Sequence, residues 1–250
     1  MLLPSLPRRQ VGFSLIELAI VLVVVALLSG GLLMSLSGQQ DRVLQKEAED
    51  QQALIRETLL GFAITYGRLP CPADPALNSA AGGNEALQQC TPAPHRASCA
   101  AGDQQCALKA GVLPWRTLGL REIDTWGNRI TYLASYDFAD PLSAAEIAAG
   151  RRSRIEMTTE GNLTIQDGAG NNVALAIPAA YIMHGKRYAG AYQTDGSQLG
   201  GAAGDEAENA DGANNQILIS HLPTESFDDL VAWIVPTVLK SRLVAVGKLP

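Results

Sequence analysis

The strongest pattern in the chain is an uncharged apolar run near its N-terminus. No charged residue occurs between Glu17 and Asp41, and residues 18–36 are almost entirely aliphatic. As a helix, this run rises about 28 Å at roughly 1.5 Å per residue, close to the hydrocarbon thickness of a bilayer. Gly30 and Gly31 lie inside it, where they either weaken the helix locally or permit close helix packing. The pattern predicts one membrane-spanning helix.

The residues before this run set its orientation. Arg8 and Arg9 precede it, and basic residues beside a first span normally stay in the cytoplasm, so we expect the rest of the chain to lie in the periplasm. A cleaved secretory signal, a twin-arginine signal or a plain signal anchor would also begin this way. Glu17 argues against these alternatives, because a lone carboxylate in an apolar membrane segment is costly and marks a function.

The helical pattern continues beyond the apolar run. Gly67 and Pro70 provide a stop after residue 66. The pattern therefore predicts one helix from about Ser14 to Tyr66, about 80 Å long, with its first half bare and its second half packed on a globular head. Between residues 39 and 66, the apolar positions that share a helical face are Val43, Leu44, Ala48, Leu54, Ile55, Leu59, Phe62 and Ile64.

The N-terminal residues also match a known processing site. Residues 8–17 read Arg-Arg-Gln-Val-Gly-Phe-Ser-Leu-Ile-Glu. This segment resembles the prepilin processing site of type IV pilins and type II secretion pseudopilins, with a short basic leader, a Gly, a Phe, an apolar pair and a Glu five residues beyond the Gly. The resemblance implies that prepilin peptidase cuts between Gly12 and Phe13, that Phe13 is then N-methylated, and that the span is retained.

The same resemblance implies an organisation and a set of partners. It divides the chain into a leader peptide (1–12), a transmembrane helix (13–36) and a periplasmic pilin-like head (37–250) that includes the second half of the long helix. The protein would be a single-pass inner-membrane protein and, after assembly, part of a pilus or pseudopilus. Its implied partners are prepilin peptidase, other pilins or pseudopilins, the inner-membrane assembly platform with its ATPase, and the membrane.

Glu17 has a physical role that does not depend on the resemblance. After cleavage, Phe13 carries a protonated amine at the start of an apolar helix, and Glu17 of a neighbouring subunit can pair with it. In a medium of low dielectric constant, the pair recovers desolvation cost that neither charge recovers alone, so assembly is favoured and its register is fixed. A pair within one chain is the alternative, because the two groups are also close along one helix.

The four cysteines all lie in a turn-rich stretch that follows the long helix. Outside the cytoplasm we expect Cys71, Cys90, Cys99 and Cys106 to form two disulfides, for which three pairings exist. A nested pairing of Cys71 with Cys106 and Cys90 with Cys99 is slightly favoured over a sequential pairing of Cys71 with Cys90 and Cys99 with Cys106. No two of them have Cys-x2-Cys spacing, which disfavours zinc.

The remaining pattern predicts an α+β head in which an antiparallel sheet packs on the long helix. Residues 124–132 read as a turn that leads into a strand, and Asp124-Thr125-Trp126-Gly127-Asn128 is similar to a segment common in pseudopilin heads. Trp126 would fill the gap between helix and sheet. Gly161 and Asn162 suggest a tight hairpin, and residues 236–247 a short helix. Further strands are predicted at residues 154–159, 162–166, 173–177, 180–184, 216–220 and 229–235.

An acidic stretch at residues 200–215 is the one candidate for a metal site. Its oxygen-bearing side chains could bind calcium, with Asp205, Glu208 and Asp211 as the chosen ligands and Glu206 and Asn209 nearby. Some pseudopilins bind calcium in a late loop. The spacing does not match an EF-hand, and a solvated, mobile surface loop is the favoured interpretation. No other cofactor is expected.

Composition and motifs narrow the function further. The formal net charge of −6 gives no broad basic surface for nucleic acid. No nucleophile elbow, phosphate loop or His-Glu-x-x-His pair is present, although Ser197 and Ser220 accompany His184 and His221. We therefore expect a non-enzymatic filament subunit, a minor one because of its large head. A membrane-anchored periplasmic hydrolase or binding protein is the alternative.

Overall fold

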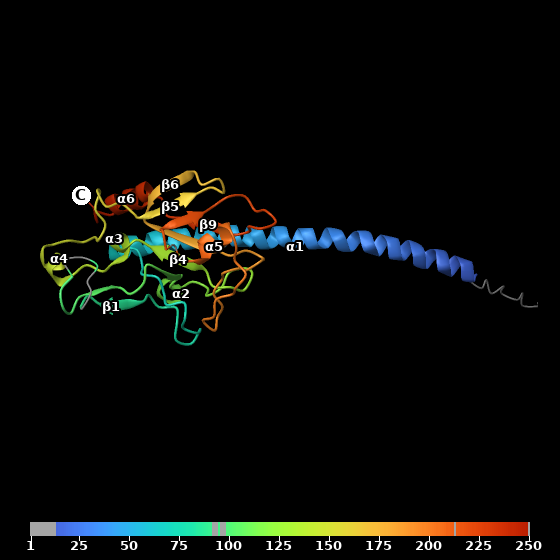
Figure 1. Ribbon diagram of the computed structural model, residues 1–250, viewed down its shortest axis with the longest axis horizontal. Helices are drawn as coiled ribbons and strands as arrows, with labels where there is room; N and C mark the ends of the chain where they lie inside the picture. The colour runs from blue at the N-terminus through green and yellow to red at the C-terminus, as the bar shows by residue number, and fades with distance from the viewer. Residues whose placement is uncertain (1–13, 92–94, 96–98, 213, 250) are drawn as a thin grey trace, which may run out of the picture. The chain divides into compact units, whose positions relative to one another are not determined.

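The computed structural model describes residues 14–91, 95, 99–212 and 214–249, and within its first helix it leaves out the side chains of residues 28–39. The chain divides into two units, Met1–Lys46 and Glu47–Pro250. The second unit contains all the strands (Figure 1). Its core and its sites are described below by themselves.

Helix α1 (Leu15–Tyr66) is the longest element of the chain. The predicted helix from about Ser14 to Tyr66 is confirmed, and α1 runs through Gly30 and Gly31 without a break. It ends where Gly67 takes a left-handed φ of +71° and its N–H group donates to the Ala63 carbonyl at 2.8 Å. A Cβ atom at Gly67 would also collide with the Arg152 carbonyl oxygen.

Within the described residues, the structure has no helix that is both long enough and apolar enough to cross a membrane.

A four-stranded antiparallel sheet packs on the second half of α1. The strand order is β3-β4-β7-β9. The strands are β3 (Ala110–Val112), β4 (Thr131–Ala134), β7 (Ala179–Met183) and β9 (Leu230–Trp233). The predicted fold class, α+β with a long N-terminal helix and an antiparallel sheet, is confirmed.

Successive side chains of the central strands point to opposite faces of this sheet. Tyr132 of β4 pairs with Tyr181 of β7, and both belong to the core cluster that contains Ile55 and Leu59 of α1. The next pair, Leu133 with Ala180, belongs to a separate cluster on the opposite face. Both faces are therefore buried, which explains why β4 and β7 read as continuous apolar runs.

A second sheet covers the face of the first sheet that points away from α1. It has three strands in the order β6-β5-β8, namely β6 (Asn172–Ile177), β5 (Leu163–Gln166) and β8 (Ile217–Ile219). Leu163, Ile165 and Leu218 from this sheet are buried against Leu133 and Ile182. The pair β5 and β8 is parallel, in contrast to the other strand pairs of the described sheets.

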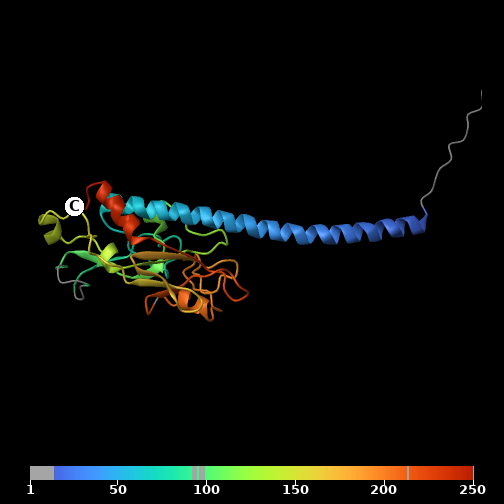
Figure 2. The same cartoon turned by 90° about the horizontal axis from the view of Figure 1, so that it is seen from above.

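Helix α6 (Pro236–Ala245) lies beside the end of α1 in both views (Figures 1 and 2). Its Leu239 and Leu243 are fully buried in the same cluster as Leu59. The predicted helix at residues 236–247 is thus confirmed, with Pro236 at its start. The remaining elements are β1 (Leu87–Gln89), β2 (Gln104–Cys106), α2 (Trp115–Leu118), α3 (Tyr136–Ala139), α4 (Ala144–Ala148) and α5 (Asp205–Ala210).

Two of the predictions of β-structure in this unit are wrong. Residues 154–159 form no strand. Arg154 is instead bound to two other segments, because its N–H group donates to the Gly67 carbonyl and its guanidinium group donates to Glu146. The tight hairpin at Gly161 and Asn162 does not form either. Gly161 instead approaches the backbone of Ile177 so closely that a Cβ atom would collide with it, and β5 pairs with β6 and β8.

The acidic stretch is also not a simple surface loop. Residues Asp205–Ala210 form helix α5, in which Glu206 and Asn209 are buried. Asn209 ties the helix to β8, because its side chain donates to the Ile219 carbonyl and accepts from the Ile219 N–H group at 3.0 and 2.8 Å. Polar side chains with backbone partners can order a segment whose composition suggests mobility.

We expect Leu59→Ala to lower the free energy of unfolding by about 2–5 kcal/mol, because it leaves a cavity between α1 and the sheet. Leu59 is fully buried, whereas Leu54 on the same helix is 56% exposed. Leu54→Ala is therefore the matched control, with an expected loss of about 0.5 kcal/mol or less. Urea unfolding of the full chain, followed by tryptophan fluorescence, measures both. Equal losses in the two variants would contradict this packing.

Candidate functional site

The processing motif lies at the very start of the described chain. Gly12 and Phe13, the predicted cleavage and methylation residues, fall outside the described residues. Ser14 is described, and its carbonyl accepts the Leu18 N–H group at 3.1 Å, which begins the helical hydrogen bonding. Glu17 lies in the first turn of α1 and is exposed. A carboxylate in a first helical turn is favoured by the helix dipole.

The apolar side chains around Glu17 are exposed as well. Leu15 is 89% exposed, Ile16 70% and Leu27 73%, and every described side chain between residues 14 and 27 belongs to the exposed class. A surface of this size and apolarity is unfavourable in water and is typical of a segment that is covered by lipid or by other subunits. The segment is therefore built for an environment other than water.

The cysteine-bearing stretch is fastened to the end of α1. The structure pairs Cys71 with Cys106, whose Cα atoms are 5.3 Å apart, and Cys90 with Cys99 at 5.7 Å. This is the nested arrangement of the two considered from the sequence. Closing a loop with a sequence separation of 35 residues constrains the unfolded chain, which contributes about 4 kcal/mol in the chain-entropy model.

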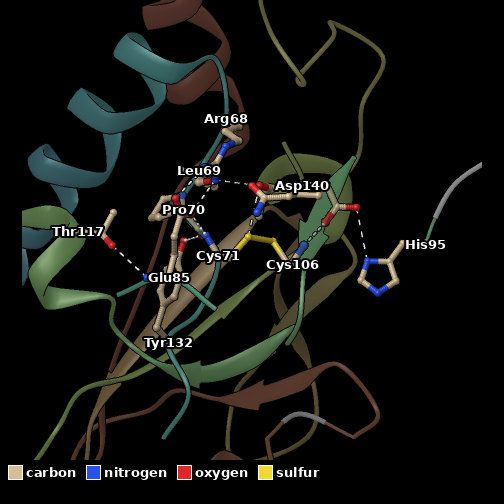
Figure 3. The surroundings of a disulfide bond; sticks show 12 residues. Arg68, Leu69, Pro70, Cys71, Glu85, His95, Cys106, Thr117, Tyr132 and Asp140 are labelled. Atoms are coloured by element: carbon tan, nitrogen blue, oxygen red, sulfur yellow. Dashed lines mark hydrogen bonds and ion pairs between the residues drawn. A yellow bond between two sulfur atoms is a disulfide. The ribbon is translucent and has the colours of Figure 1, made fainter. Parts of the chain in front are cut away.

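Polar groups surround the Cys71–Cys106 disulfide on both sides (Figure 3). Arg68, just after α1, forms a bidentate ion pair with Glu85 at 2.8 and 2.8 Å, and Glu85 also accepts the Cys71 N–H group at 3.0 Å. On the other side, Asp140 accepts the Cys106 N–H group at 2.8 Å and lies 3.5 Å from His95. These partners, which sequence reasoning missed, fix both half-cystines through their backbone.

The Asp124–Asn128 turn is held by its own hydrogen bonds and places Trp126 on the core. One carboxylate oxygen of Asp124 accepts the N–H groups of Trp126 and Asn128 at 2.9 and 3.0 Å, and Gly127 has a φ of +90°. Burial raises the pKa of Asp124, against the lowering effect of its backbone hydrogen bonds. Trp126 packs on the core beside α1, so its predicted position and the turn at Asp124 and Gly127 agree with the structure.

The proposed calcium ligands do not converge. Asp205 lies 3.0 Å from His221, Glu208 accepts from Asn215, and Asp211 accepts the Asn214 N–H group at 3.3 Å. Across residues 14–91, 95, 99–212 and 214–249, no group of three or more His, Cys, Asp or Glu residues is arranged to hold a metal ion. The three carboxylates are used within the head itself.

Helix α5 belongs instead to a buried polar network that the sequence did not reveal. His184 lies 2.8 Å from the Thr131 hydroxyl group and 3.2 Å from Asp229, whose other oxygen accepts from Asn209 at 2.8 Å. All four residues are buried, with exposures from 0 to 4%. The network links β4 and α5 to the residue just after β7 and the residue just before β9, through hydrogen bonds in a buried environment, where such bonds are strong.

This network also bears on the hydrolase alternative. Thr131, His184 and Asp229 are hydrogen-bonded in the order hydroxyl, imidazole and carboxylate, as in a catalytic triad. All three are buried, so none of them is accessible to a substrate. Ser197 donates to Asp195 at 2.6 Å rather than to a histidine, and His221 stacks on Phe227 with ring centroids 3.9 Å apart. The geometry gives the Ser–His alternative no support.

Comparison with known proteins adds one match. A family model described as the prokaryotic N-terminal methylation motif matches residues 7–33. The chain carries the type IV pilin and pseudopilin signature. No curated protein and no solved structure matches the chain. The match thus covers the processing site and the first part of α1, and does not extend to the head.

The pilin signature indicates the general kind of protein and how it is processed. It is typical of structural subunits that are anchored in a membrane and associated with a pilus. It also implies processing by prepilin peptidase and assembly with other pilins. The exposed apolar side chains near Glu17 lie within the matched segment, so the exposed apolar surface and the signature coincide.

We expect Asp124→Asn to stabilise the protein at neutral pH. Because folding raises the pKa of Asp124, its contribution to stability is largest below the unfolded pKa of about 3.9 and is lost as the pH rises through the folded value. Asparagine keeps the acceptor oxygen for Trp126 and Asn128 but carries no charge. In urea unfolding of the full chain between about pH 4 and pH 7, the free energy of unfolding of the variant should rise relative to that of the wild type as the pH rises.

Asp195→Asn is the control with the opposite sign. Asp195 makes a similar turn, but hydrogen bonds from Ser197 lower its pKa, so loss of its charge should destabilise the protein at neutral pH. A stability difference for Asp124→Asn that does not change with pH would show that folding leaves the pKa of Asp124 unshifted.

Proposed function

We propose that this chain is a minor subunit of a type IV pilus or of a type II secretion filament. In this proposal, prepilin peptidase cuts between Gly12 and Phe13, Phe13 becomes N-methylated, and residues 13–36 hold the protein in the inner membrane with the head in the periplasm. The observation that carries the proposal is the methylation motif at residues 7–33, followed by a helix with exposed aliphatic side chains. The assembly platform and its ATPase then move the subunit into the filament.

Glu17 is the residue on which assembly depends. It is the one charged residue in the described part of the chain from Ser14 to Gln40, and it stands in the first turn of α1. Cleavage before Phe13 creates an amine, and the carboxylate of Glu17 in one subunit pairs with that amine in the next. Both charges lose water when the helices pack, so a mismatched register leaves two uncompensated charges in an apolar medium.

The head supports a minor position in the filament. It makes up most of the chain, as the unit Glu47–Pro250, and it adds a second sheet behind the sheet that packs on α1. A large head on a helical anchor limits how densely such subunits can be stacked. The head is also fastened by two disulfides, which suit an oxidising compartment such as the periplasm.

The mature N-terminus tests the proposed processing. We expect mass spectrometry of the protein from membranes of a host with prepilin peptidase to find a chain that begins at a methylated Phe13. In a host that lacks the peptidase, the same chain should begin at Met1. A native product that still starts at Met1, or one that is trimmed beyond residue 30, would contradict the proposal.

Glu17→Val tests the assembly role. We expect normal membrane insertion but an about tenfold or greater loss from sheared filaments, the factor that corresponds to about 1.4 kcal/mol. The control is Glu47→Val, which removes an exposed carboxylate further along the same helix. The Glu47 carboxylate lies 3.4 Å from Arg121. This control should assemble normally. Wild-type amounts of Glu17→Val in the filament would rule out the charge pair as the basis of assembly.

A further inference from the structure

The two edges of the four-stranded sheet differ. At one edge, β3 is covered by the cysteine-bearing stretch, because Ala73 and Val112 exchange two backbone hydrogen bonds of 2.8 and 3.1 Å. At the other edge, β9 pairs with β7, and no strand of the described chain pairs with its outer side. An uncovered edge strand is a template for another polypeptide.

The register shows which backbone groups this edge presents. Ile234 donates its N–H group to Ala179 at 2.9 Å, and β9 is antiparallel to β7 with Trp233 opposite Ala180 and Val231 opposite Ile182. In an antiparallel pair, hydrogen-bonded and non-hydrogen-bonded positions alternate. The N–H and C=O groups of Val231 and Trp233 therefore point away from β7, as four partners for an added strand.

A groove of about 490 Å³ runs beside this edge. Its one wall is β9 and the residues up to Val235, and its other wall is a line of α1 formed by Gln52, Arg56 and Leu60. These three residues are spaced four apart, so they lie along one side of the helix. Neighbouring strands in a sheet are about 4.8 Å apart, which places the next strand position beyond β9 within this groove.

The charges and apolar groups along the groove define what fits there. Arg56 is exposed, and it forms no ion pair with any carboxylate of the described residues. Glu57 also lines the groove, but it lies 3.7 Å from Arg242, which balances its charge. The exposed apolar lining comes from Val235 and Val238, which are 43% and 42% exposed, whereas Leu60 lines the groove but is only 2% exposed. The groove thus offers one uncompensated positive charge next to an aliphatic surface.

The spacing of these groups matches a β-strand. Arg56 and Leu60 are about 6 Å apart along the helix axis. Side chains two positions apart on a strand point the same way and are about 6.6 Å apart. A strand laid along β9 that places an acidic side chain at Arg56 would therefore place its next side chain on the same face over Leu60, which is itself only 2% exposed.

We propose that the groove beside β9 binds an extended acidic segment of a partner protein, which pairs with β9 as a fifth strand and places a carboxylate on Arg56. Backbone hydrogen bonds to Val231 and Trp233 provide the pairing, and the two side chains that face α1 provide selectivity. Every group involved lies in the unit Glu47–Pro250, so the proposal does not depend on processing or filament assembly.

The test uses the full chain in detergent micelles and a defined probe, the peptide acetyl-Thr-Thr-Glu-Thr-Val-Thr-Val-Thr-amide. Its glutamate and valines share one face of a strand. We expect saturable binding in the millimolar range, together with slower hydrogen exchange at the Val231 and Trp233 amides but not at Ala232, whose N–H group already faces β7. A peptide with lysine in place of glutamate should bind at least tenfold more weakly.

Variants separate the charge from the backbone pairing. Arg56→Glu should reverse the preference, so that the lysine peptide binds at least tenfold better than the glutamate peptide. Val231→Pro removes one outward N–H group without touching the pairing with β7, and should weaken both peptides at least tenfold. Unchanged exchange at Tyr181 verifies that the sheet is intact. The matched control, Arg152→Glu, changes an exposed arginine that lines a different groove and should leave binding unchanged.

Three results would overturn the proposal. The first is absence of binding to the wild-type chain with either peptide. The second is binding that survives N-methylation of the probe at the amides that face β9, because such binding would not be strand pairing. The third is protection of Val231 and Trp233 that rises with protein concentration in the absence of peptide, because the occupant would then be a second copy of this chain.

Discussion

The head of this protein depends on the contact between the second half of α1 and the four-stranded sheet. Ala48, Ile55, Leu59 and Ala63 are each at most 1% exposed and follow one face of the helix. The two alanines at the ends of this face have small side chains, and the two larger residues are buried in one cluster with Tyr132 and Tyr181 of the sheet. Burial of this face is the main favourable term available to fix the sheet in place.

The two parts of α1 have different surroundings. In the first unit its aliphatic side chains are exposed, and in the second unit its apolar face is buried against protein. A helix satisfies its backbone hydrogen bonds internally, so it can continue from one environment to the other without leaving polar groups unpaired. This explains how a short processing motif and a head with its own core can share one uninterrupted element.

The sequence predicted the features that rest on local pattern. The extent of α1 follows from its apolar spacing and from Gly67, and β5, β6, β7, β8 and β9 all coincide with predicted strands. Residues 154–159 resembled a strand, but the tie from Arg154 to Gly67 and Glu146 comes from residues distant in sequence. The predicted helical face was also partly wrong, because Val43 and Leu54 are exposed.

The candidate site was predictable to a similar degree. The methylation motif is local and was identified in full from residues 8–17. The buried network of Thr131, His184, Asn209 and Asp229 was not, because its members come from four separate parts of the chain and only the tertiary fold brings them together. Composition likewise described residues 200–215 as mobile, since the hydrogen bonds of Asn209 that order α5 leave no trace in composition.

The disulfide and the open sheet edge are two consequences of one arrangement. The Cys71–Cys106 bond holds the segment from Cys71 onward next to β3, and Ala73 in that segment closes this edge of the sheet. Sheets extend only at edges, so closure on one side leaves β9 as the side on which the four-stranded sheet can grow. The short length of β9 and the start of α6 at Pro236 limit such growth to a brief strand, which restrains aggregation while it leaves room for a specific partner.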